Sequence, residues 1–128
     1  MPLGDADAQQ RSLERGARSR EVRGLLEAFA ERLEQGEFRH SCPGGTVCLD
    51  LDDDMEALRA VVAASFARYT DAIERHLAFG SRRRAASFAR LLLTAIEGAY
   101  VRGRADRSSE PFREAGAWLA EVAEREAA

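Results

Sequence analysis

The stretch that decides the fold is LLLTAIEGAYV, residues 91–101. Only Thr94 and Glu97 are polar in it, and Gly98 is its only poor helix former. A helix that is apolar nearly all round is buried from several sides. In a chain of 128 residues, such a helix lies either at the centre of the domain or between its own core and a partner subunit. The sequence that follows, residues 102–112, favours the second arrangement.

Length and composition indicate one soluble domain. Apolar residues make up 45% of the 128 positions, which is enough for a single core. The net charge of −3 gives the chain as a whole no attraction to nucleic acid. No apolar run resembles a signal peptide or reaches the roughly 20 residues that span a bilayer. With only two cysteines there is no disulfide framework, so we expect a cytoplasmic protein.

The first half of the chain predicts one amphipathic helix and a long second one. Residues 1–18 are polar and are expected to form a flexible tail or a short helix, ahead of a domain over 19–128. Ser19 is a candidate N-cap for a helix over 20–35 that stops at Gly36. Asp53 and Glu56 have the spacing of a capping box, which predicts the longest helix over 55–79.

Between these helices the pattern is ambiguous. Val47, Leu49 and Leu51 alternate with polar residues, which locally favours a short strand. No second strand candidate exists in the sequence, and a lone strand would leave its backbone groups unpaired. We therefore expect a short helix or turn that carries Val47 and Leu51 into the core.

The second half predicts two further helices. Ser81 is expected to cap a helix over 82–104, and Ser108 to Pro111 begin the last helix. The fold class is therefore all-α, with four main helices and a short fifth element.

No catalytic or metal site is expected. His40, Cys42 and Cys48 lie close together, but the C-x5-C spacing matches no common zinc pattern. The acidic run at 50–54 lacks the glycine and glutamate of a calcium loop, so helix capping is the better interpretation. No nucleophile–base–orienter set or phosphate-binding loop is present, which argues against an enzyme and against a cofactor. Glu97 is expected to be partly buried, with a structural partner favoured over a ligand.

The order of several short motifs resembles a known family. In chain order these motifs are FAERL at 29–33, SCPGGTVCL at 41–49, LR at 58–59, FARY at 66–69, AIEGA at 95–99, RADRS at 104–108 and PF at 111–112. Together they are similar to the C-terminal domain of TetR-family transcriptional regulators, most of all the LmrA/YxaF-like subgroup. The family's N-terminal helix-turn-helix is missing. Gly44-Gly45 and Arg102 also depart from its pattern.

The resemblance implies a homodimer that binds a small apolar or amphipathic effector and does not bind DNA by itself. The dimer surface, a four-helix bundle formed with the partner, would fall on Leu93, Ile96, Glu97, Gly98, Tyr100, Phe112, Ala115, Trp118, Leu119 and Val122. The effector pocket would be lined by Phe29, Leu33, Val47, Phe66, Tyr69, Thr70, Phe88 and Leu92, with Tyr69 and Thr70 as polar anchors. The chain is then either a fragment of a regulator or a headless relative. The alternative is a free-standing interaction protein that heterodimerises with a full-length regulator and titrates it.

Overall fold

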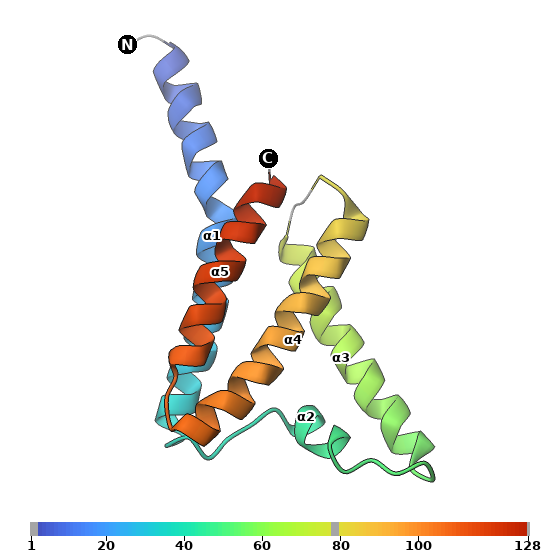
Figure 1. Cartoon of the computed structure of the whole chain (residues 1–128). Coiled ribbons are helices and arrows are strands. Elements are labelled where there is room, and N and C mark those ends of the chain that lie inside the picture. Colours follow the sequence, from blue (N-terminus) through green and yellow to red (C-terminus); the bar gives the residue numbers. More distant parts are fainter. Residues whose placement is uncertain (1–2, 78–79, 128) are drawn as a thin grey trace.

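All regular structure in the described part of the chain is helical. The computed structural model describes residues 3–77 and 80–127. It contains α1 (Leu3–Gln35), α2 (Pro43–Cys48), α3 (Glu56–His76), α4 (Arg82–Asp106) and α5 (Glu110–Ala127), shown in Figure 1. None of these described residues forms a strand, so the all-α prediction is confirmed, as is the preference for a short helix near Val47. The expectation that this segment carries Val47 and Leu51 into the core is wrong, because both residues are only half-buried and α2 has no buried residue.

Helix α1 differs most from its predicted bounds. The predicted start at Arg20 is wrong, because the helix begins at Leu3 and continues through Ser19, which is therefore no N-cap. The preceding residues 3–18 include several Ala, Arg, Gln and Leu, which favour helix, and they contain no proline that would end it. The predicted end at Gln35 is confirmed. There the Phe38 N–H donates to the Leu33 carbonyl at 2.9 Å, and Phe38 takes a left-handed φ of 62°.

Helix α3 is shorter than predicted, and α1 is the longest helix instead. Helix α3 begins at Glu56 with Met55 as N-cap, and no side chain caps it. The predicted capping role of Asp53 is therefore wrong. Because Met55 is the N-cap, Glu56 is the first residue of the helix and cannot occupy the third position that a capping box with Asp53 requires. Its carboxylate is paired with Arg59 in the same helix. The helix ends at His76 and Leu77 is buried, while position 79 lies outside the described residues.

The turn between α4 and α5 brings these two helices together. Ser81 caps α4 as predicted, since its Oγ accepts from the Arg84 N–H at 3.4 Å. At the C-terminal end of α4, in the turn to α5, the Ser108 N–H donates to the Gly103 carbonyl at 3.0 Å. A Cβ at position 103 would lie 2.7 Å from Leu33 Cδ2 and 2.8 Å from the Ser108 carbonyl oxygen. Only glycine permits this close approach.

The core lies where α1, α4 and α5 meet. In Figure 1, α5 runs alongside the C-terminal half of α1 and α4 crosses from α5 to α3. Phe112 of α5 is fully buried, with its ring centroid 6.0 Å from that of Phe29 and 5.0 Å from that of Tyr100. These edge and stacked arrangements are the favoured geometries for aromatic pairs. The aromatic cluster therefore joins all three helices.

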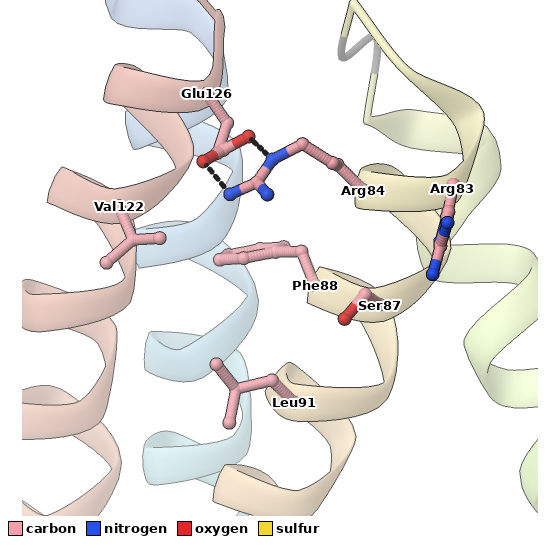
Figure 2. A pocket seen from close by; sticks show the side chains of 7 residues that line it. All are labelled: Arg83, Arg84, Ser87, Phe88, Leu91, Val122 and Glu126. Carbon is pink, nitrogen blue, oxygen red and sulfur yellow. Dashed lines mark hydrogen bonds and ion pairs between the residues drawn. The ribbon is translucent and has the colours of Figure 1, made fainter.

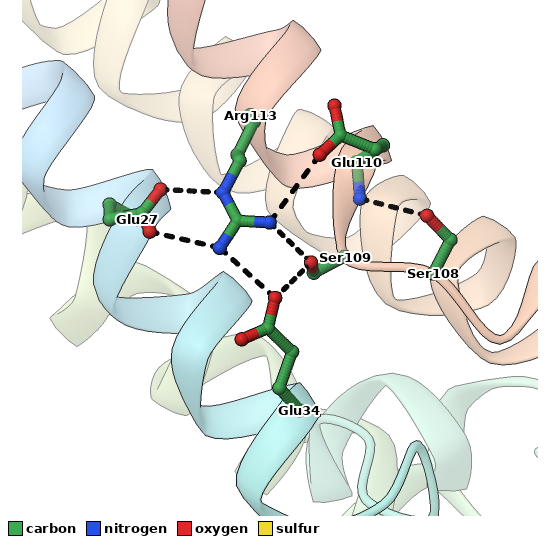
Figure 3. A network of polar contacts seen from close by, with 6 residues as sticks. All are labelled: Glu27, Glu34, Ser108, Ser109, Glu110 and Arg113. Atoms are coloured by element: carbon green, nitrogen blue, oxygen red, sulfur yellow. Dashed lines mark hydrogen bonds and ion pairs between the residues drawn. The ribbon is translucent and has the colours of Figure 1, made fainter.

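A polar clamp fixes α5 on α1 beside this cluster (Figure 3). The Arg113 guanidinium donates to both carboxylate oxygens of Glu27, at 2.8 and 2.9 Å, and its Nη2 lies 3.0 Å from Glu34. Ser109 also donates to Glu34. The hydrogen bond from Arg113 lowers the pKa of Glu27, and those from Ser109 and Arg113 lower the pKa of Glu34. The bidentate geometry fixes the relative orientation of α1 and α5.

Candidate functional site

An apolar cavity of about 490 Å³ opens between α1, α3 and α4. Polar groups are few and lie on exposed residues of its wall, among them Arg32 and His76. The remainder is aliphatic or aromatic. We call this space the apolar cavity; it is lined by Glu21, Val22, Leu25, Phe29, Arg32, Tyr69, Ala72, Ile73, His76, Leu77, Leu92, Leu93 and Ile96. Its size and lining suit a small organic molecule.

The structure brings three of the eight predicted pocket residues to this cavity, namely Phe29, Tyr69 and Leu92. Phe66 and Phe88 line two other cavities, and Leu33 is fully buried in the core. Val47 lies half-buried on α2, away from this lining.

The two predicted polar anchors behave differently. The Tyr69 side chain reaches the wall of the apolar cavity. The Thr70 hydroxyl donates within its own helix, to the carbonyls of Phe66 at 3.1 Å and Ala67 at 3.0 Å. Its donor is therefore not directed toward a ligand.

Several residues that line the apolar cavity were not predicted from the sequence. Leu25 and Ile73 belong to the apolar stripes of α1 and α3, and Leu77 directly follows α3 four residues after Ile73, so helical spacing could have identified all three. Leu93 and Ile96 were assigned to the dimer surface, yet both line the cavity. Periodicity identifies an apolar face but not which neighbour covers it.

A second cavity of about 530 Å³ lies under α2. We call it the Glu97 cavity; it is lined by Ser41, Cys42, Gly45, Thr46, Cys48, Leu49, Phe66, Glu97, Gly98, Tyr100, Val101 and Arg104. Burial, with a hydrogen bond to the Glu97 carboxylate, raises the pKa of the Cys42 thiol. Burial likewise raises the pKa of Tyr100. In the described part of the chain, no three His, Cys, Asp or Glu residues gather as metal ligands would.

The outward faces of α4 and α5 expose large apolar side chains. Trp118 is 73% exposed, Val101 62% and Leu91 50%. On α4, exposed residues recur at Ser87, Leu91, Thr94, Gly98 and Val101, with the alternating spacing of four and three that forms one stripe along a helix. A Cβ at Gly98 would meet no atom within 4 Å, so this position faces open space.

The ten residues predicted for the dimer surface divide into two groups. Ile96, Tyr100 and Phe112 are buried inside the chain, so they can act on a partner only through their neighbours. The others are half-buried or exposed: Leu93, Glu97, Gly98, Ala115, Trp118, Leu119 and Val122. Leu91 and Val101 were not predicted, although both are exposed on the same stripe of α4 as Gly98.

Figure 2 shows how α4 and α5 meet at one end of this surface. Phe88 and Leu91 of α4 face Val122 of α5 across a cavity of about 510 Å³, and the Arg84–Glu126 ion pair spans its rim. Arg84 lowers the pKa of Glu126. The ion pair connects the two helices that carry the exposed apolar residues.

Comparison with known proteins identifies one family. The model for the transcriptional regulator LmrA/YxaF-like, C-terminal domain, matches residues 19–118. No curated protein and no solved structure matches the chain. None of the described helices is long and apolar enough to cross a membrane.

Proposed function

Because the chain belongs to the TetR-type family of LmrA/YxaF-like C-terminal domains, we propose that it is the effector-binding and dimerisation part of such a regulator. Two copies pair through the outward faces of α4 and α5. Each copy binds a small, largely apolar molecule in the apolar cavity. The chain does not bind DNA by itself, and we place it in the cytoplasm.

Dimerisation is supported by the chemistry of the α4–α5 surface. Trp118 and Val101 are large apolar side chains that are mostly exposed, and large apolar surface left exposed on a folded chain marks interaction sites. Gly98 has no side chain, so a partner helix can approach α4 closely there. Two helices from each copy then form a four-helix bundle.

Effector binding is supported by the volume and lining of the apolar cavity. At about 490 Å³ it falls within the usual range of ligand pockets. Leu25, Ile73 and Leu93 supply apolar wall from three different helices, so a ligand there contacts α1, α3 and α4 together.

One observation carries the proposal: helix α4 lines the apolar cavity on one side and exposes apolar residues on the opposite side. Leu92, Leu93 and Ile96 line the apolar cavity, while Leu91 and Gly98 are exposed on the other side of the same helix. A ligand that shifts α4 therefore also shifts the surface that the partner contacts.

Light scattering tests the dimer. The chain is expected to be a dimer at micromolar concentration, and Gly98→Leu is expected to shift it toward monomer because leucine holds the helices apart. Gly24, exposed on α1, offers the matched control Gly24→Leu, which should leave the dimer unchanged. A strictly monomeric wild type would refute the dimer.

Fluorescence anisotropy with duplex DNA should detect no sequence-specific binding.

Nile red, a neutral apolar dye, tests the cavity. Ile73→Glu places a charge in the apolar wall and should abolish the dye's fluorescence increase. Leu58→Glu changes an exposed residue of α3 outside the cavity and should leave the increase intact. Equal binding by both variants would show that the dye, and by extension an apolar effector, binds elsewhere.

A further inference from the structure

The Glu97 cavity contains a carboxylate in an unusual position. Glu97 lies in the middle of α4, half-buried, and its carboxylate is directed toward α2. A Cβ at Gly45 would collide with Glu97 Oε2, so the missing side chain at position 45 makes room for the carboxylate. The carboxylate therefore lies beside Gly45 of α2, in the lining of this cavity.

The carboxylate retains acceptor capacity toward the cavity. The Cys42 thiol donates to it, and a thiol is a weak donor that carries no charge. An ionised carboxylate accepts up to about four hydrogen bonds, so most of its capacity is unused by this contact. No ion pair joins Glu97 to Arg or His among the described residues.

The remaining walls suit the body of an organic molecule. Phe66, Leu49 and Val101 line the cavity, and the Tyr100 ring forms another part of its wall. Aromatic faces attract cations, most strongly where water is excluded.

Arg104 is the nearest basic group on the same wall. It lies seven residues from Glu97, about 10 Å along the helix axis, and its Nε donates to the Phe38 carbonyl at 3.4 Å. Arg104 is exposed, so solvent screens its charge more than that of the half-buried Glu97. The cavity therefore has a negative inner end and a weakly positive outer end.

We propose that the Glu97 cavity is a second ligand site, which binds an organic cation with its ammonium group at the Glu97 carboxylate and its apolar body against Phe66 and Tyr100. This site is separate from the apolar cavity and does not depend on effector binding there. Its recognition element is a charge, which the apolar cavity lacks among its buried residues.

Calorimetric titration with three probes of one shape tests the site. Phenylbutylamine, phenylbutanol and phenylbutyrate carry a positive, neutral and negative end on the same body. Wild-type protein should bind the amine about tenfold more tightly than the alcohol, the increment of a partly desolvated cation contact. The butyrate should bind no more tightly than the alcohol.

Variants locate the preference. Glu97→Gln keeps the size of the side chain and an acceptor for Cys42 but removes the charge, so the amine should lose its advantage. Glu21→Gln removes a carboxylate at the apolar cavity and is the matched control; it should keep the advantage. Gly45→Ala leaves the charge but displaces the carboxylate, and should reduce the preference even if Glu97→Gln folds poorly by circular dichroism.

Several results would overturn the inference. Equal affinity of wild type for amine and alcohol, or no measurable amine binding, excludes a cation site. If the preference for the amine over the alcohol survives in both Glu97→Gln and Gly45→Ala, the cation binds elsewhere. If that preference is lost in Glu21→Gln, the cation binds in the apolar cavity. Nile red binding that is blocked by Ile73→Glu would still support the effector proposal in each case, so the two failures are distinguishable.

Discussion

Trp118 provides the sharpest test of the α4–α5 surface, because it is the only tryptophan in the chain and is 73% exposed. A large aromatic side chain can bury up to about 250 Å², so a partner covering the exposed part of Trp118 would remove roughly 180 Å² from water. At about 25 cal/mol per Å² that area is worth at most roughly 4.5 kcal/mol. The loss of side-chain freedom on binding and imperfect packing reduce this gain in binding free energy. Interface tryptophans commonly contribute about 2 kcal/mol or more.

Trp118→Ala should therefore raise the dimer dissociation constant by about 30-fold or more. Sedimentation equilibrium measures this constant, and the wild-type tryptophan emission should shift to shorter wavelength as protein concentration rises. Tyr69→Ala truncates an exposed aromatic residue of α3 and is the control, with no expected change in dimer affinity. Unfolding of monomeric Trp118→Ala should change by less than about 0.5 kcal/mol, since the side chain is exposed. Concentration-independent emission together with unchanged dimer affinity would refute the assignment of this surface.

Three further predictions concern the stability of the chain. Phe112→Ala should lower the free energy of unfolding by about 4 kcal/mol in urea titrations, because it empties the aromatic cluster; a loss below about 1 kcal/mol would contradict the observed packing. Gly103→Ala should lower the free energy of unfolding by about 1 to 3 kcal/mol, because the added methyl group clashes with Leu33 and Ser108. Gly24→Ala, in open space on α1, should raise it by up to about 1 kcal/mol. Equal effects of the two substitutions would contradict the close approach at Gly103. The pKa values of Glu27, Glu34 and Glu126 lie below their ordinary value of 4.5 in the folded chain, so their stabilisation is present above that pH and is lost as pH falls through the folded pKa values. The melting temperature should accordingly fall as the pH is lowered from about 5 to about 2. In Arg113→Met this fall should be less steep. Equal slopes of melting temperature against pH in the two proteins would show that the clamp does not contribute.

The fold was largely predictable because its signals are local. Ser81 caps α4 and Gln35 ends α1 as their sequences predict. The start of α1 was not predictable from Ser19, because a serine inside a run of helix formers does not stop the helix. Asp53 failed as a cap because α3 begins at Glu56 with Met55 as N-cap, which leaves Asp53 two residues ahead of the capping position.

The candidate site was harder to predict because periodicity does not identify neighbours. Tyr100 and Phe112 have the apolar spacing of a seam, yet the structure packs them against Phe29 inside the chain. Leu91 and Leu93 are two positions apart on α4, yet Leu93 lines the apolar cavity and Leu91 is half-exposed. Only the three-dimensional packing of α1 distinguishes these roles.

The unbroken length of α1 has a mechanical consequence. Phe29 contacts the apolar cavity near one end of this helix and Leu3 lies at the other, 26 residues away, or about 39 Å at 1.5 Å per residue. A tilt of about 5° pivoting at Phe29 would move Leu3 by roughly 3 Å. Any tilt that starts at the cavity would therefore produce its largest displacement at the Leu3 end of α1, and distance measurements are best made there.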